Sequence, residues 1–216
     1  MKPAPGKPPR DATRERTRER IVAAALEIIG REGVQGFTVR RVTEAADVNL
    51  ALVNYHFRSK QALVDETLAH YFQGITKVFE ILDGVDAPPE AKLRRFIEEY
   101  LKNLFAYPGA FTSQILIMVE QSTLGGHGGG GRRAPSRAFL AMLKEGTSRL
   151  KACLGELLGT DDESIVGLRA VQLLTNIAHP MFLTGFPKTL FHLDFHNAAI
   201  REKYIDMAME AATGRR

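Results

Sequence analysis

The chain contains almost no cysteine, because Cys153 is the only one among 216 residues. A single cysteine excludes an internal disulfide and fits a reducing compartment. No run of about 18 apolar residues is present that could span a bilayer, and the N-terminal residues lack the apolar centre of a signal peptide. We therefore expect a cytoplasmic protein that neither crosses nor enters a membrane.

The sequence also lacks the signatures of common catalytic sites. It contains no Gly-x-Ser-x-Gly, no His-Glu-x-x-His and no Cys/His arrangement suited to a nucleophile. Cys153 lies among leucines, which favours a small core residue over a redox switch. The glycine-rich segment 124–133 has neither the Gly-Lys-Ser/Thr ending of a Walker loop nor a strand before it, so we interpret it as a surface loop. We predict that the protein is not an enzyme and has no cofactor.

One histidine pair has a spacing that suits metal binding. His192 and His196 are four residues apart, which would place both imidazoles on one helical face, with Asp194 and His179 as further candidate ligands. However, His192 precedes the helix-capping residue type at Asp194, and no Cys or Glu completes a recognisable ligand set. We therefore expect no metal site.

Positive charge is concentrated at the N-terminal end of the chain. Residues 1–60 carry 12 Lys and Arg against 7 Asp and Glu, whereas residues 61–216 carry 17 against 18. The formal net charge of +4 therefore arises in the first 60 residues. Such asymmetry steers a domain toward polyanions.

Helical periodicity runs through the sequence, and no alternating pattern of useful length indicates a strand. Prolines at 89 and 108 mark helix starts, and Ser136, Asp162 and Asp194 are residue types that cap helices. The fold class is therefore predicted to be all-α. The expected helices span about 11–32, 59–82, 89–106, 108–122, 136–158, 162–184 and 194–212, in addition to two short ones between 38 and 56.

Those two short helices form the most informative segment. Thr38 and Asn49 are N-cap residue types, each placed before a short apolar run, and Ser59 is a third cap that opens a longer helix. Between the short helices, Asp47 stands where the chain must turn sharply. Inward-facing Val42, Ala46, Val48 and Leu52 would lock the two helices at a steep angle. The outer face of residues 49–55 would then be free to enter a DNA major groove.

This segment resembles the DNA-binding domain of the tetracycline-repressor (TetR) family over residues 14–64. The resemblance rests on Val42-x-x-Ala45-Ala46-x-Val48-Asn49, on Asn54-Tyr55-His56-Phe57 and on Ser59-Lys60-x-x-Leu63. The sequence departs from the family pattern at Thr43, where alanine is common, and at Asp47, where glycine is usual. From motif and resemblance together, the predicted DNA-contacting residues are Thr38, Arg40, Arg41, Asn49, Leu50, Ala51, Asn54, Tyr55, His56 and Lys60, with His56 at a scaffold position of the family motif.

The resemblance implies a domain organisation. Residues 1–10, rich in Pro and Lys, form a disordered basic tail; residues 11–58 form a helix-turn-helix domain of three helices; and residues 59–216 form a helical domain that binds a ligand and dimerises. The implied inducer cavity needs apolar walls and a few polar groups that orient the ligand. The predicted ligand-binding residues are Phe72, Phe105, Phe111, Gln114, Ile115, Met118, Gln121, Phe139, Met142, Asn176, His179 and Phe182, although an ordinary core must account for most of the apolar ones.

The last two helices, about 162–184 and 194–212, mix small and large apolar residues and are predicted to form a homodimer interface, as the corresponding pair does in the family. The sequence thus favours a regulator bound to double-stranded operator DNA and released by a small hydrophobic or amphipathic molecule, most simply as a repressor. Two alternatives stay open: an activator of the same architecture, and an architectural DNA-binding protein that does not switch.

Overall fold

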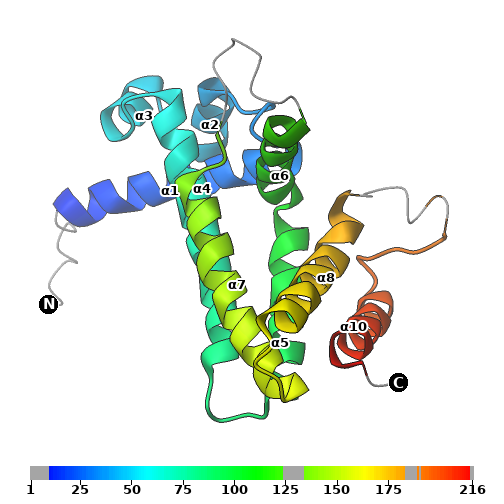
Figure 1. Cartoon of the computed structure of the whole chain (residues 1–216). Helices are drawn as coiled ribbons and strands as arrows, with labels where there is room; N and C mark the ends of the chain where they lie inside the picture. The colour runs from blue at the N-terminus through cyan, green and yellow to red at the C-terminus, as the bar shows by residue number, and fades with distance from the viewer. Residues whose placement is uncertain (1–9, 124–133, 183–188, 190, 215–216) are drawn as a thin grey trace, which may run out of the picture.

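The computed structural model describes residues 10–123, 134–182, 189 and 191–214, and every regular element in these ranges is a helix (Figure 1). The predicted all-α fold class is therefore confirmed. The predicted tail and the glycine-rich segment fall on residues outside those described. The elements are α1 (Arg10–Glu32), α2 (Val39–Ala46), α3 (Leu50–His56), α4 (Lys60–Phe79), η1 (Glu80–Asp83), α5 (Pro89–Ala106), α6 (Pro108–Thr123), α7 (Arg137–Leu158), α8 (Glu163–Phe182) and α10 (Ala198–Thr213).

The helices are grouped into two parts along the chain. Figure 1 shows α1, α2 and α3 at one end of the molecule, with α4 leading away from them beside α7 and with α10 at the far end. The N-terminal part is the helix-turn-helix domain, and the remaining helices form the second, larger domain. Residue 58 lies in the short connection between α3 and α4, and the division of the chain into two domains at that residue stays a prediction.

Polar side chains cap the helices where the sequence placed them. The side-chain oxygens of Thr38, Asn49, Ser59 and Ser136 each accept a hydrogen bond from a backbone N–H three residues further on. Asp162 Oδ1 likewise accepts from two N–H groups in the first turn of α8. Because the first N–H groups of a helix have no partner within it, these caps fix where five of the helices begin.

One predicted helix start is wrong. The last helix begins at Ala198 with Asn197 as its cap, and not at Asp194. Asp194 instead accepts from the backbone N–H of His196 within a turn (3.0 Å). The ring of Phe195 lies parallel to that of Phe105 on α5, with centroids 6.1 Å apart, and this contact accompanies the extra turn before the helix starts. Capping chemistry alone does not distinguish the two positions.

An aromatic core lies between α4, α5 and α7. Phe79 packs on Phe96 and Tyr100, with ring centroids 4.8 and 5.5 Å away, and all three rings are buried. Gly146 on α7 faces Phe79, and a Cβ there would lie 2.6 Å from the ring. Cys153, also on α7, is buried as predicted, and burial raises the pKa of its thiol.

The helix-turn-helix domain is joined to the second domain by a very close contact between α1 and α6. A Cβ at Gly109, in the first turn of α6, would lie 2.5 Å from the Ile29 carbonyl oxygen and 2.7 Å from the Gly33 backbone nitrogen. A Cβ at Gly30 would lie 2.6 Å from the Tyr107 ring. Gly33 also ends α1 in the left-handed region at φ +70°, as predicted. Glycine therefore allows the two backbones to touch directly.

Candidate nucleic-acid interface

The turn between α2 and α3 is as tight as the sequence predicts. Asp47 adopts the left-handed conformation at φ 50° and ψ 56°, and its N–H bonds back to the carbonyls of Thr43 and Glu44. Arg20 on α1 reaches this turn, because its Nη2 donates to the Ala46 carbonyl oxygen at 2.6 Å. A guanidinium at the C-terminal end of a helix also complements the helix dipole. α1 therefore holds the turn that orients α3.

The inner face of α2 packs against α1, and α3 packs against α2. Val42 and Ala46 are buried, as predicted, and so are Val53 and Phe57. Val48 and Leu52 are only half-buried. The predicted inward face of α3 is therefore wrong by one residue, because Val53 and not Leu52 is the fully buried residue of this helix. The opposite face of α3 is consequently left toward solvent.

That outer face contains the predicted base-contacting residues. Asn49, Ala51 and Asn54 are exposed, and Leu50 and Tyr55 are 54% and 64% exposed despite their apolar surface. Asn49 is also the N-cap of α3: its Oδ1 accepts from the Leu52 N–H at 2.8 Å, so this oxygen is already committed within the protein. An asparagine such as Asn54 can form a bidentate contact with adenine.

An arginine that the sequence motif did not single out extends this surface. The Arg14 guanidinium lies over the Tyr55 ring, 5.2 Å from its centroid, and this contact joins the N-terminal half of α1 to α3. His56 is half-buried beside them; burial, together with the charges of Arg14 and Arg18, lowers its pKa. The only signal in the sequence was the basic first half of α1, which did not indicate which arginine meets α3.

The predicted phosphate-contacting residues are held in different ways. Lys60 is exposed at the N-terminus of α4, with its ammonium 5.7 Å from the centroid of the Phe37 ring. Arg40 is exposed and pairs with Glu44 at 3.0 Å. Arg41 instead makes a bidentate ion pair with Glu32. The hydrogen bond from Arg41 is the main reason why the pKa of the Glu32 carboxyl is lowered.

The partners of Arg40, Arg41 and Thr38 within the protein determine how freely each residue could contact DNA. Exposed ion pairs exchange readily, so Arg40 stays available to a phosphate. Arg41 also donates to the Gly36 carbonyl (3.0 Å), and it therefore ties the segment before α2 to the end of α1. The Thr38 hydroxyl caps α2. DNA contact by these residues stays a prediction.

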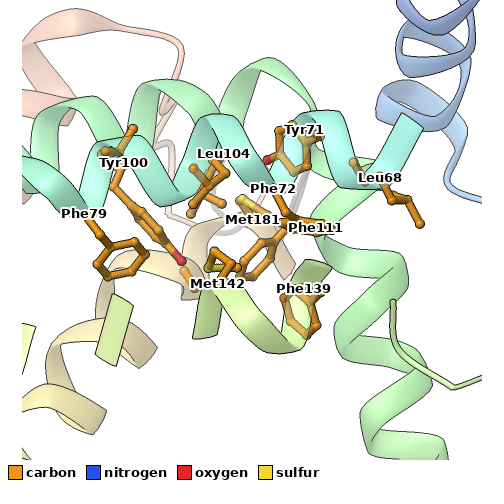
Figure 2. Close-up of a cluster of buried hydrophobic side chains, with 14 of the residues drawn as sticks. Leu68, Tyr71, Phe72, Phe79, Tyr100, Leu104, Phe111, Phe139, Met142 and Met181 are labelled. Carbon is orange, nitrogen blue, oxygen red and sulfur yellow. The ribbon is translucent and has the colours of Figure 1, made fainter. Parts of the chain in front are cut away.

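The predicted ligand-binding residues fall into separate groups. Four of them pack on one another, as Figure 2 shows: the Phe139 ring lies 5.0 Å from Phe72 and 5.7 Å from Phe111, and Met142 is buried beside them. In this conformation they are core side chains in contact. Ile115, Met118 and Phe105 are half-buried, whereas Asn176 and His179 are exposed on α8. The side chains of Gln121 and Phe182 lie outside the described residues.

Gln114 is different from both groups. It is only 2% exposed, and its Oε1 accepts from the backbone N–H of Ser136 at 2.6 Å, which ties α6 to the start of α7. It also lines a cavity of about 250 Å³ together with residues of α4. The structure therefore brings one of the predicted polar ligand-binding residues to a cavity, whereas Phe72, Phe111 and Phe139 lie in the packed core.

The predicted dimerisation helices differ in how much apolar surface they expose. On α8, Ile165, Leu168 and Val171 are exposed, with Leu168 at 68%. On α10, most of the apolar residues expected at the interface are instead buried against the chain's own helices; these are Ile205, Ala208, Met209 and Ala212. Their apolar character is explained by packing within one subunit, so α8 supplies most of the unpartnered apolar surface.

The described part of the chain contains neither a metal-ligand cluster nor a membrane-spanning helix. Among those residues, no group of three or more His, Cys, Asp and Glu side chains is placed to hold a metal ion. Within the same ranges, no helix combines the length and the apolar character that crossing a bilayer requires.

The geometry defines a class: an all-α protein whose helix-turn-helix presents an exposed helix flanked by basic groups. The family model described as bacterial regulatory proteins, tetR family, matches residues 21–67, which run from the middle of α1 into α4. Over these residues the helix-turn-helix domain of the chain matches the TetR family of bacterial regulatory proteins.

Curated relatives match over the same region. The HTH-type transcriptional repressor NicS of Pseudomonas putida is 29% identical over 83 residues, which are 38% of this chain and 39% of NicS. An uncharacterized HTH-type transcriptional regulator in the dhlA 5' region of Xanthobacter autotrophicus is 42% identical over 55 residues, 26% of this chain and 27% of that protein. The chain therefore matches less than half the length of either relative.

Solved structures match over nearly the whole chain at low sequence identity. SCO4454, a TetR-family transcriptional regulator from Streptomyces coelicolor, superposes with a TM-score of 0.67 at 17% identity and covers 93% of this chain and 94% of its own. A HlyIIR mutant protein gives a TM-score of 0.66 at 19% identity, covering 94% of this chain and all of that one. These likenesses show that the second domain shares the overall fold of these proteins.

Proposed function

We propose that the protein is a DNA-binding transcriptional regulator that acts in the cytoplasm as a homodimer and represses genes until a small hydrophobic or amphipathic molecule releases it from a palindromic operator. The observation that carries the proposal is the outer face of α3. Leu50 and Tyr55 are large side chains that remain 54% and 64% exposed, and the exposed Asn54 lies between them in the sequence. Exposed apolar groups beside hydrogen-bonding groups suit the edges of bases in a major groove.

Charge and rigidity support the same conclusion. Arg14 lies against Tyr55, and Lys60 stands at the N-terminal end of α4, so cationic groups flank α3 on both sides. Such groups contact phosphates and position a reading helix without conveying sequence information. The hydrogen bond from Arg20 to the turn and the Arg41–Glu32 pair hold α2 and this turn on α1, and α3 packs on α2, so the three helices can dock as one body.

A second copy would supply the symmetry that a palindromic site requires. The exposed apolar row of Ile165, Leu168 and Val171 on α8 is the surface proposed to meet its equivalent. Release by a ligand then requires only that the ligand prefer a conformation with a different spacing of the two α3 helices, for a coupling of typically 1–3 kcal/mol. The relative NicS is described as a transcriptional repressor, and this supports the proposal that the protein represses its genes.

The test is recovery of the DNA bound by the protein in cells, followed by binding measurements on the purified protein. The proposal expects the recovered fragments to share a palindrome, and Asn54→Ala to lose the preference for it over random DNA. Lys203→Ala, on the exposed surface of α10, is the control and should bind as the unsubstituted protein does. Recovered fragments without a common sequence, or equal affinity for palindromic and random DNA, would contradict the proposal.

A further inference from the structure

A cleft lies where α4, α6 and the start of α7 meet the connection between α1 and α2. Its volume is about 250 Å³, and it is lined by Val34, Gln61, Asp65, Leu68, Gln114 and Ile117, among others. Leu68, Gln114 and Ile117 are buried and form its floor, whereas Gln61 and Asp65 are exposed at its rim. Phe72, Phe111 and Phe139 are not among the residues that line the cleft, whereas Leu68 belongs both to its lining and to the buried cluster in Figure 2.

The polar groups of the cleft are few and specific. Asp65 Oδ1 accepts from Gln61 Nε2 at 2.8 Å, and this amide brings no charge to balance the carboxylate. The lining residues that the structure describes include no lysine or arginine. On the floor, Gln114 Oε1 accepts a hydrogen bond from the Ser136 N–H at 2.6 Å. A pocket with an apolar floor and a few convergent polar groups is the usual form of a small-molecule site.

We propose that this cleft binds a small organic amine. Its ammonium group would lie at the rim against the Asp65 carboxylate, and its apolar body would cover Leu68 and Ile117 on the floor. Hydrogen bonds between an ammonium and a carboxylate are stronger than those between neutral partners. A carboxylate or a fatty acid of the same size is disfavoured, because it would bring a second negative charge next to Asp65.

The place of the cleft couples it to DNA binding, and this step rests on the proposed function. Gln61 directly follows Lys60, the cation at the N-terminus of α4, and Val34 belongs to the connection that leads into α2. A molecule that fills the cleft therefore contacts both the helix-turn-helix domain and the first turns of α4. The backbone contact of Gly109 with α1 keeps α6 fixed on the opposite wall. Occupancy is thus expected to move α4 against α2 and to change DNA affinity.

The binding step is tested with benzylamine, using benzoate as a probe of the same size and opposite charge. At about 10 mM, benzylamine is expected to raise the melting temperature of the full chain by roughly 2 °C, whereas benzoate is not. Asp65→Asn should abolish the shift, and Asp86→Asn, at an exposed aspartate outside the cleft, should keep it. Amide chemical-shift changes should centre on Val34, Leu68 and Ile117. No shift with benzylamine, an equal shift with benzoate, or a shift that survives Asp65→Asn overturns the amine site.

The coupling step is measured separately, as the affinity for recovered operator DNA with and without benzylamine. A change of threefold or more that disappears in Asp65→Asn is expected. If benzylamine binds but the affinity for operator DNA does not change, the regulatory role is overturned, whereas the amine site in the cleft still stands. If the protein without ligand shows no preference for any DNA sequence, the proposed function fails, and the melting and chemical-shift results still decide whether the amine site exists.

Discussion

Replacing Gly109 by alanine should destabilise the protein through the joint between its two parts. The added methyl would lie 2.5 Å from the Ile29 carbonyl oxygen and 2.7 Å from the Gly33 nitrogen, about 1 Å closer than ordinary van der Waals contact. Both neighbours are backbone atoms and cannot rotate away, so α6 must shift relative to α1. Overpacking of this kind costs typically 1–3 kcal/mol, and the upper end applies here. Alanine's better helix propensity offsets about 1 kcal/mol. The net loss is therefore about 2 kcal/mol.

Thermal unfolding followed by circular dichroism measures this loss, which corresponds to a melting temperature roughly 4–8 °C lower for a chain of this size. Gly74→Ala is the matched control, because no atom lies within 4 Å of its added methyl and α4 gains helix propensity. That variant should melt slightly above the unsubstituted protein. If Gly109→Ala is as stable as Gly74→Ala, the two backbones are not in direct contact, and the argument for a fixed joint fails.

Three other experiments test the helix-turn-helix. Asp47→Gly should raise the free energy of unfolding by about 0.5–1 kcal/mol in urea, since glycine removes the strain of the left-handed turn; a loss of stability would show that the Asp side chain contributes more than it costs. A double-mutant cycle of Arg14→Ala with Tyr55→Leu should give a coupling of about 0.5–1 kcal/mol in DNA affinity, and additive effects would dismiss the Arg14–Tyr55 contact. Lys60→Ala should weaken binding to all duplexes alike and reduce the slope of log affinity against log salt by about 0.9; an unchanged slope would remove Lys60 from the phosphate contacts.

Local signals in the sequence predicted the helix-turn-helix well because its determinants are local. Thr38, Asn49 and Ser59 cap helices through bonds that span three residues, and the residue type at Asp47 tolerates the turn it must make. Helical periodicity placed the other helices for the same reason. Asp194 was misplaced because the competing cap lies only three residues away, and the choice between them depends on an aromatic contact with α5.

The binding surfaces were harder to predict because they depend on which side chains meet across the fold. A Phe or Met at helical spacing has the same pattern whether it lines a cavity or fills a core, and Phe72 and Phe139 turn out to touch each other. The cleft depends on Val34 and Asp65, which are far apart in sequence and share no motif. Arg41 looked like a free cation, but its partner Glu32 lies on the preceding helix. Nothing in local spacing shows such pairings.

The solitary buried thiol has a practical consequence for spectroscopy. Cys153 is almost fully covered, and burial raises its pKa, so it presents little thiolate to an alkylating label. A cysteine introduced on the exposed side of α3, for example Ala51→Cys, would therefore react nearly alone. In a symmetric pair of subunits this single substitution creates two equivalent spin labels, and the distance between them reports directly how far apart the two α3 helices stand under each condition.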